Sequence, residues 1–413
     1  MKNKRYCWIV VLAAVLLLLL QSRSRPAMNI DNLVSCENGT NPSPIDSEFE
    51  FRGDLLFVKR DKSEILAFNG KTHQFTSIFR LPESGTADVS PLSQDGKTLV
   101  VSYQNPSDMK NLSVIVLSPQ GITESSKIPI PPFGHDRERI IQWASIGWVN
   151  SDFLQGVLFE KGMVGDELSQ NQFFKPYKSE WEPLNVMVQD LDLDPVGGFL
   201  FSPDLTRVLY VNSDYHLALY DFSQKKNIWK YDDYDGISPN EQSPILEDAI
   251  WSLDGNMLAI PLTNEDTVPI ALILDKDGEI VNSIFFGNYQ HGFSWSKDGN
   301  FLAFYEDRCT TIDSIIRCEA KPVIRVISTK DGLLRDLCSL TEGILPTQSI
   351  RNFRIIWSPD QDFLAYSAAN HETGAGGFFL QKLNDPEVRI IDVNDDSLIL
   401  LGWSQEHWEK AQP

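Results

Sequence analysis

Short runs of five or six mainly apolar residues recur along most of the chain, and polar turns rich in aspartate and glycine separate them. Residues 98–103, 208–212, 257–261 and 301–305 are examples, each with β-branched or aromatic side chains. Runs of this length and composition are typical of β-strands and too short for helices. The pattern therefore predicts an all-β protein.

Residues 357–366, which read Trp-Ser-Pro-Asp-Gln-Asp-Phe-Leu-Ala-Tyr, form a unit that the chain repeats in altered form. Proline presets the first corner of a type I turn, and serine and aspartate side chains bond back to the turn's backbone. The unit therefore predicts a strand end, a tight turn and an antiparallel strand. Its first residue, the anchor of each repeat, occurs at Leu92, Trp148, Phe201, Trp251, Trp295, Trp357 and Trp403.

The anchors follow one another at intervals of 44 to 62 residues, which is enough chain for four strands and leaves no room for helices. We therefore predict a single seven-bladed β-propeller over residues 53–408, with four antiparallel strands in each blade. An aromatic residue at the same point of most repeats predicts packing between blades rather than ligand stacking. The repeated aspartates are expected to form turns, because a catalytic carboxylate would occur once.

The two ends of the predicted propeller complement each other. Residues 398–404 carry the last anchor but lack the following chain that would build a blade, whereas the strands within residues 54–79 lack an anchor before them. We predict that the C-terminal strand becomes the innermost strand of the first blade and closes the ring, which removes an open sheet edge.

The Trp-Ser-x-Asp-Gly repeats, followed by Leu-Ala-Phe or Leu-Ala-Tyr, resemble those of TolB-type periplasmic proteins and of prolyl-oligopeptidase propellers. The resemblance covers residues 53–404 and implies the fold, since such repeats occur in scaffolds, receptors and enzyme accessory domains alike. The few dozen residues before Gly53 are expected to be too few for the separate N-terminal domain of TolB, and we expect seven blades where six are usual in TolB. No hydrolase domain is expected after Trp403, so the resemblance implies no peptidase activity.

The N-terminal segment has the features of an export signal. Lys2, Lys4 and Arg5 precede an apolar run over residues 6–20. Residues 1–27 are expected to be a signal peptide or an uncleaved signal anchor, and residues 28–52 a tether. This organisation predicts an extracytoplasmic protein, secreted, periplasmic or at the cell surface, that meets the membrane only through its N-terminal segment.

The charge argues against one class of partner. The formal charge is −21, and residues 1–27 hold five basic and no acidic side chains, so the remainder carries −26. A body this acidic excludes nucleic acid as a partner and keeps an exported protein soluble. We expect a monomer.

Because strands alternate in direction within a blade, the first-to-second and third-to-fourth connections lie on one face, here called the tight-turn face. The second-to-third and blade-to-blade connections lie on the other, the long-loop face. Long loops on one face of a rigid scaffold are where binding usually occurs. The long segments of this sequence are residues 127–139, 161–181, 231–248, 309–318 and 368–377.

Candidate binding residues lie in or near these segments. Residues 231–236 are the densest mixture of aromatic and acidic groups, able to hold a cation or a sugar, although a solvated acidic loop fits the same composition. No spacing typical of a metal site, phosphate-binding loop or catalytic motif occurs, so no cofactor, metal or catalytic residue is predicted. The candidates are Tyr231, Asp233, Tyr234, Asp235, His291 and His371.

Two functions fit these features. The first is a non-enzymatic binding or scaffold module for a protein or cell-envelope partner, acting through the long-loop face. The alternative is a propeller-type polysaccharide hydrolase or lyase, which would need a pair of carboxylates at a defined separation. A screen of glycan substrates distinguishes the two.

Four cysteines lie beyond the N-terminal segment: Cys36, Cys309, Cys318 and Cys338. Cys309 and Cys318 flank a loop between two predicted neighbouring strands, where antiparallel strand ends come close enough for a disulfide in an oxidising compartment. We predict that they form one. Cys36 and Cys338 are left as a remaining pair.

Overall fold

The computed structural model describes the chain between residues 42 and 410, apart from several internal gaps. The described residues are 42–59, 61–81, 86–105, 107–108, 110–130, 141–160, 169–175, 178, 180–182, 191, 199–212, 216–231, 249–263, 269–285, 289–307, 309–312, 315–318, 323–337, 344–345, 355–370, 376–385, 387–391 and 398–410.

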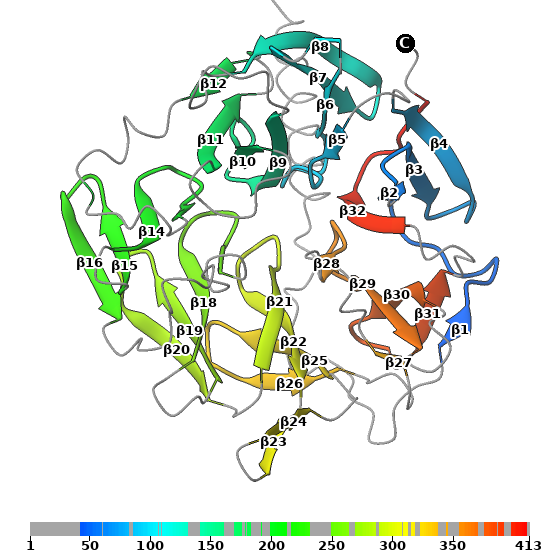
Figure 1. Ribbon diagram of the computed structural model, residues 1–413. Helices are drawn as coiled ribbons and strands as arrows, with labels where there is room; N and C mark the ends of the chain where they lie inside the picture. The colour runs from blue at the N-terminus through cyan, green and yellow to red at the C-terminus, as the bar shows by residue number, and fades with distance from the viewer. Residues whose placement is uncertain are drawn as a thin grey trace, which may run out of the picture.

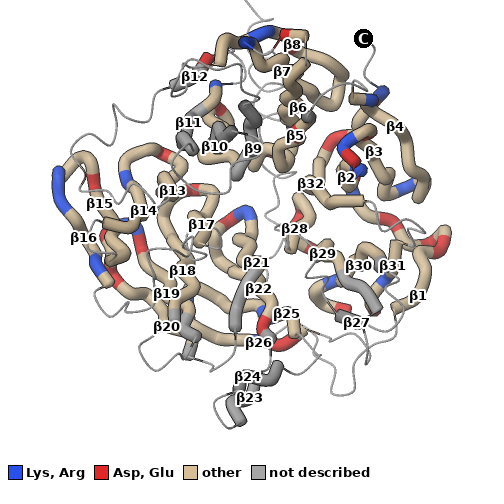
Figure 2. Tube along the Cα trace, viewed as in Figure 1, with Lys and Arg blue, Asp and Glu red and all other residues tan. Residues whose placement is uncertain are grey.

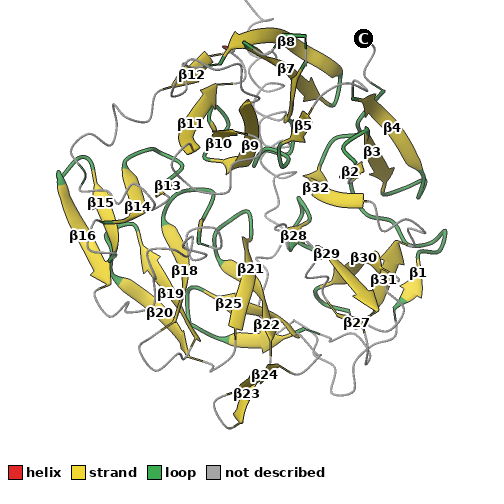
Figure 3. Ribbon diagram, in the orientation of Figure 1, coloured by secondary structure: helices red, strands yellow, loops and turns green. Residues whose placement is uncertain are grey.

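Seven sheets stand around a central axis like the blades of a propeller (Figure 1). Each blade is a four-stranded antiparallel sheet whose strands follow one another outward from the axis. Figure 3 shows strands and connections in the described part of the chain, and no α-helix. The predicted all-β, seven-bladed propeller is therefore confirmed.

The strands of each blade are given from the innermost outward. Blade 1 comprises β32 (Leu398–Ser404), β2 (Asp54–Lys59), β3 (Glu64–Asn69) and β4 (Phe75–Arg80), and blade 2 comprises β5 (Thr86–Val89), β6 (Leu99–Gln104), β7 (Asn111–Ser118) and β8 (Gly121–Pro129). Blade 3 comprises β9 (Ile141–Trp148), β10 (Leu154–Glu160), β11 (Ser169–Lys175) and β12 (Glu180–Glu182), and blade 4 comprises β13 (Phe199–Phe201), β14 (Arg207–Val211), β15 (Leu217–Asp221) and β16 (Lys226–Tyr231).

The last three blades contain three additions to the pattern, one of which is a second short strand at the inner position of blade 7. A separate hairpin of β23 (Cys309–Ile312) and β24 (Ile315–Cys318) is inserted in blade 6, and β1 (Ser43–Pro44) lies outside blade 7. Blade 5 comprises β17 (Ile250–Trp251), β18 (Met257–Thr263), β19 (Pro269–Asp275) and β20 (Ile280–Phe285), and blade 6 comprises β21 (Tyr289–Trp295), β22 (Phe301–Asp307), β25 (Val323–Ser328) and β26 (Leu334–Asp336). Blade 7 comprises β28 (Ile356–Trp357) with β27 (Ile344–Leu345), β29 (Phe363–Asn370), β30 (Gly376–Lys382) and β31 (Val388–Ile391).

The serine and aspartate of the repeated unit hold the turn between the first and second strands. In blade 5 the hydroxyl of Ser252 donates to Asp254 at 2.7 Å and accepts from the backbone N–H of Met257 at 2.9 Å. The same pair of bonds occurs in four other blades, which explains why the motif recurs. The corresponding serines are Ser93, Ser202, Ser296 and Ser358.

The third residue after each of these serines has a left-handed backbone conformation, which favours glycine. Gly299 occupies this position in blade 6 with φ = 70°, but Gln361 occupies it in blade 7 with φ = 63°. A side chain in this conformation costs about 1–2 kcal/mol. We expect Gln361→Gly to stabilise the protein by about 1 kcal/mol in urea unfolding, and Gly299→Ala to destabilise it by a similar amount. A loss of stability in Gln361→Gly would contradict this account of the turn.

The aromatic anchors pack between blades, as predicted. Trp251, Trp295 and Trp357 are all buried. Each indole N–H also donates to a backbone carbonyl of the preceding blade: Trp295 to Ile250 at 3.0 Å and Trp357 to Ser294 at 2.9 Å. The anchor therefore joins neighbouring blades by apolar contact and by a hydrogen bond.

This bond gives a prediction for Trp357→Phe. Phenylalanine keeps most of the buried surface but leaves the carbonyl of Ser294 without the indole donor, so we expect a loss of about 1–3 kcal/mol in the free energy of unfolding. Urea unfolding at neutral pH measures it. Unchanged stability would show that packing alone holds the anchor.

The ring is closed by the C-terminal strand, as the sequence predicted. β32 pairs antiparallel with β2, with Leu55 opposite Trp403 and Asp54 opposite Ser404. The Trp403 indole donates to the carbonyl of Arg52 at 2.9 Å, and the Ser404 hydroxyl to that of Gly96 at 2.8 Å. The last strand thus bonds to the first blade and to the turn of the second.

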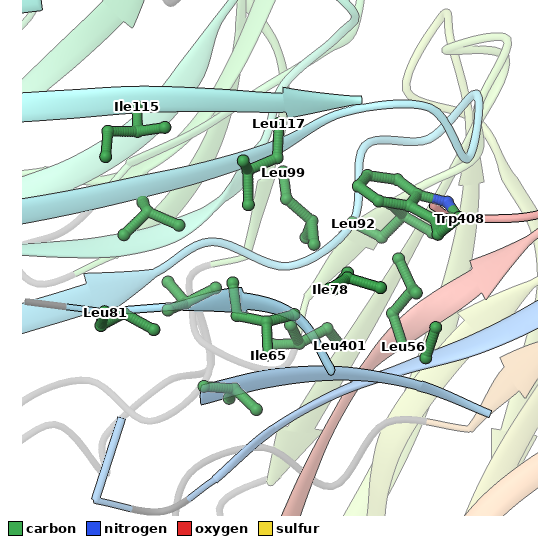
Figure 4. Close-up of a cluster of buried hydrophobic side chains, with 14 residues drawn as sticks. Leu56, Ile65, Ile78, Leu81, Leu92, Leu99, Ile115, Leu117, Leu401 and Trp408 are labelled. Atoms are coloured by element: carbon green, nitrogen blue, oxygen red, sulfur yellow. The ribbon is translucent and has the colours of Figure 1, made fainter. Parts of the chain in front are cut away.

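Residues 405–409 extend this closure into a C-terminal clasp over blades 1 and 2. The carboxylate of Asp54, which is fully buried, accepts from the backbone N–H of Trp408 at 2.8 Å and from Asn69 at 2.9 Å. His407 Nδ1 lies 2.7 Å from the same carboxylate. Figure 4 shows the Trp408 side chain beside Leu92 within the apolar cluster shared by the two blades.

The segment before β2 packs against the seventh blade. Ordered structure therefore starts before Gly53, although the sequence predicted that the propeller begins at that residue. β1 pairs parallel with β31, and Arg389 donates to Ser43 at 2.9 Å. Phe51 is buried between blades 7 and 1 and contacts Trp403 edge to face. Local composition did not reveal this because proline and serine also suit a tether.

Candidate functional site

The antiparallel order of every blade fixes the two faces of the propeller. Connections such as those between β5 and β6 or between β19 and β20 are tight turns and share one face. The glycines of these turns lie close to the neighbouring blade: a Cβ added to Gly278 would lie 2.9 Å from the carbonyl oxygen of Ile228. The tight-turn face is therefore closely packed, and the long-loop face is the candidate functional surface.

Strands occupy part of the segments expected as loops. Residues 161–181 include β11 and β12, residues 309–318 form the β23–β24 hairpin, and residues 368–377 include the paired ends of β29 and β30. These are corrections to the predicted loop lengths. β11 reads Ser-Gln-Asn-Gln-Phe-Phe-Lys, and its polar first half hides it from apolar patterning.

The structure does not bring the predicted binding residues together within its described part. Tyr231 ends β16 and is half-buried, with its ring stacked on Trp229 at 6.1 Å between centroids. His291 lies on β21 opposite Tyr305. Asp233, Tyr234, Asp235 and His371 lie outside the described residues.

An ion-pair network that the sequence did not indicate links β22, β25 and β26 of blade 6. Glu306, near the end of β22, is buried and lies 2.9 Å from Arg325 Nη1, while Arg325 Nε lies 2.9 Å from Asp336. A buried carboxylate next to a guanidinium gives the strand ends a fixed geometry. The only sequence signal is the charge of Glu306 directly after an apolar run.

Two buried tyrosines lie in the seam between blades 6 and 7. The rings of Tyr305 and Tyr366 meet edge to face at 6.4 Å between centroids. Burial raises the pKa of both phenols above the usual value, and for Tyr305 the neighbouring Tyr366 raises it further. Both therefore stay neutral and contribute to the core rather than to acid–base chemistry at neutral pH.

The turn carboxylates are bound by their own turns. Burial raises the pKa of Asp254, but hydrogen bonds from Ser252 and Asn256 outweigh it and hold that pKa below the usual value. The pKa of Asp204 is lowered in the same way, against burial, by Ser202 and Thr206. Ionised carboxylates of this kind are poor general acids, which supports their structural role.

Within the described part of the chain, no three or more histidine, cysteine, aspartate or glutamate side chains gather in a way that could hold a metal ion. A search of the same residues for a helix long and apolar enough to cross a membrane finds none.

The inserted hairpin places Cys309 and Cys318 at paired positions. They are Cα partners at the first and last positions of the antiparallel pair β23–β24. Directly opposed residues in such a pair have Cα atoms about 4.5–5.5 Å apart, within the range of a disulfide. The register is compatible with the bridge predicted from the sequence, which stays a prediction. Cys36 and Cys338 lie outside the described residues.

We expect non-reducing peptide mass mapping of protein from an oxidising compartment to recover the two cysteines in one linked species. The bridge closes a short loop and should stabilise the hairpin by at most about 3 kcal/mol. Two free thiols at these positions would contradict the prediction. Cys318→Ser, which leaves Cys309 free, controls for the assignment.

Comparison with known proteins finds relatives only by structure. No family model matches the chain, and no curated protein matches its sequence. Solved structures of similar fold include the Cps50 (Swd1) β-propeller domain of Myceliophteria thermophila, with 14% identity over 84% of this chain and 97% of that one and a TM-score of 0.44.

Two bacterial structures are also similar. An uncharacterized protein of Listeria monocytogenes is 11% identical over 85% of this chain and 95% of its own, with a TM-score of 0.45. TolB of Acinetobacter baumannii is 13% identical over 69% of this chain and 63% of its own, with a TM-score of 0.35. TolB is thus among the solved propellers that this chain resembles, as its repeats suggested.

Proposed function

We propose that this chain is a non-enzymatic, extracytoplasmic propeller that binds a protein or cell-envelope partner through its long-loop face. The observation that carries the proposal is the asymmetry between the faces. The tight-turn face is built from short turns that hydrogen-bond within themselves, whereas the long connections and the β23–β24 hairpin belong to the opposite face. Loops on a rigid scaffold are the usual site of binding.

The loop that begins at Tyr231 is the first candidate contact. Tyr231 ends the outer strand of blade 4, and the acidic and aromatic residues of 232–236 follow it directly. Tyrosine and aspartate together suit a partner surface with basic and polar groups. The β23–β24 hairpin is the second, because it is inserted between β22 and β25, a connection of the long-loop face.

The location rests on the N-terminal segment, residues 1–27, with its basic start and its apolar run. In an exported protein this segment is the membrane contact, and the acidic propeller is the part that meets the partner. β1 runs parallel to β31, so Ser43 lies on the tight-turn side of blade 7.

Affinity capture from cell-envelope extracts tests the proposal. Residues 231–235 are replaced by glycine and serine, and we expect the captured partner to be lost. A control variant, Lys71→Ser with Thr72→Ser, changes exposed residues of the tight turn between β3 and β4 and should capture the same partner. Equal capture by all forms would remove the loop from the site, and turnover of a defined glycan by the purified protein would favour a hydrolase or lyase instead.

A further inference from the structure

The outermost strand of blade 5, β20, differs from the outer strands of the other blades. It reads Ile-Val-Asn-Ser-Ile-Phe and, among the fourth strands of the seven blades, is the one that contains no charged residue. The outer strands β4, β8, β12, β16, β26 and β31 each contain at least one charged residue. Figure 2 shows this contrast in the blue lysines of the neighbouring β16.

Charged side chains on an edge strand prevent unwanted pairing with other chains, so their absence from β20 leaves its edge open to pairing. Among the described residues, no strand pairs with that outer edge. The edge is also apolar at the surface: Ile280 is 54% exposed and Val281 41% exposed. Ile284 of the same strand is buried against blade 6, so the strand is fixed in place.

The molecule itself shows that an outer edge can accept a strand. β1 pairs with β31, the outermost strand of blade 7, through the register Ser43 with Arg389 and Pro44 with Ile390. The outer edges of these blades therefore have the geometry needed to extend a sheet by one strand, which is a common mode of peptide recognition.

We propose that β20 is a docking site for an extended, apolar segment of a partner protein, which adds to blade 5 as a fifth strand. Backbone hydrogen bonds supply affinity, and Ile280 and Val281 contact apolar side chains of the segment. Asp277 and Glu279 are exposed just before the strand, next to the single positive charge of Lys276. This local excess of negative charge lies on a protein whose residues 28–413 carry a formal net charge of −26. It therefore favours a segment with basic residues on either side of its apolar part.

The same charge argues against a second copy of this chain as the occupant, because two bodies of −26 repel each other at close range. The site lies on the rim of the ring rather than on the long-loop face (Figure 1). A negative result for this site would therefore not count against the partner proposed for the long-loop face.

The test uses a defined probe, a fluorescent peptide of alternating valine and threonine with two lysines at each end. We expect saturable binding by fluorescence anisotropy to the full chain, with slower hydrogen exchange of the amides of residues 280–285. Val281→Lys and Ile280→Lys should each weaken binding at least about tenfold, since a lysine on the edge opposes pairing. Leu333→Lys, which changes an exposed apolar residue outside β20, should stay within twofold.

Three results would overturn the proposal. Equal binding of a peptide with alternate N-methylated residues would exclude backbone pairing, and unchanged binding to both lysine variants would exclude β20. A dimer in sedimentation that Val281→Lys abolishes would make a second copy the occupant. Since both substituted residues are exposed, thermal melting should be unchanged and confirms that the variants are folded.

Discussion

A chain that ends after Asp396 will be aggregated or sensitive to protease, because it lacks β32. Loss of this strand removes the buried side chains of Leu401 and Trp403 and uncovers the inner edge of β2. Each buried side chain contributes about 1.5–3 kcal/mol, and the apolar side chains of β2 that become exposed add to this, so the sum approaches the 5–15 kcal/mol stability of a typical domain. Limited proteolysis and thermal unfolding measure the effect.

A chain that ends after Trp408 is the matched control. It keeps β32 and the C-terminal clasp up to Trp408, and the truncation removes the hydrogen bond from the N–H of Glu409 to the carbonyl of Pro119. We expect its melting temperature to lie close to that of the full chain. Cooperative melting of the shorter chain at the full-length temperature would show that β32 does not hold the ring closed.

Trp408→Ala should be the most damaging single substitution in the clasp. The indole is fully buried among residues of blades 1 and 2, and removing a buried tryptophan side chain costs about 3–5 kcal/mol through lost burial and the cavity that remains (Figure 4). Urea unfolding monitored by fluorescence gives the value.

Trp408→Phe separates packing from hydrogen bonding at this position. Among the described residues the indole Nε1 has no hydrogen-bond partner, so phenylalanine loses volume but no bond. We expect a loss well below that of Trp408→Ala. Equal losses in the two variants would indicate that the N–H matters, for example through a bound water.

Much of the fold was predictable because the repeat encodes its own turn. The Ser-x-Asp pair that closes the turn at Ser252 is local, so its bonds follow from residues within five positions. Closure was predictable for a different reason: a lone final anchor and a first blade without one can satisfy each other only by pairing. Both expectations were confirmed, closure by the pairing of β32 with β2.

Other features depend on contacts between distant residues, which patterning does not report. The packing of Phe51 between blades 7 and 1, the clasp on Asp54 and the ion pair of Glu306 with Arg325 each join segments that are separate in sequence. The candidate binding loop at residues 232–236 was predicted from composition alone, and composition sets no geometry. Its role therefore remains a proposal that the capture experiment tests.

Closure by the last strand also sets the order in which the protein can be completed during synthesis. Asp54 pairs with Ser404, so the first blade waits for a strand made 350 residues later. At about 5–20 residues per second, this delay is roughly 20–70 s. During that time the inner edge of β2, with Leu55, Leu56 and Phe57, has no partner strand. Until that strand is made, the nascent chain carries an apolar edge that is open to pairing with other chains.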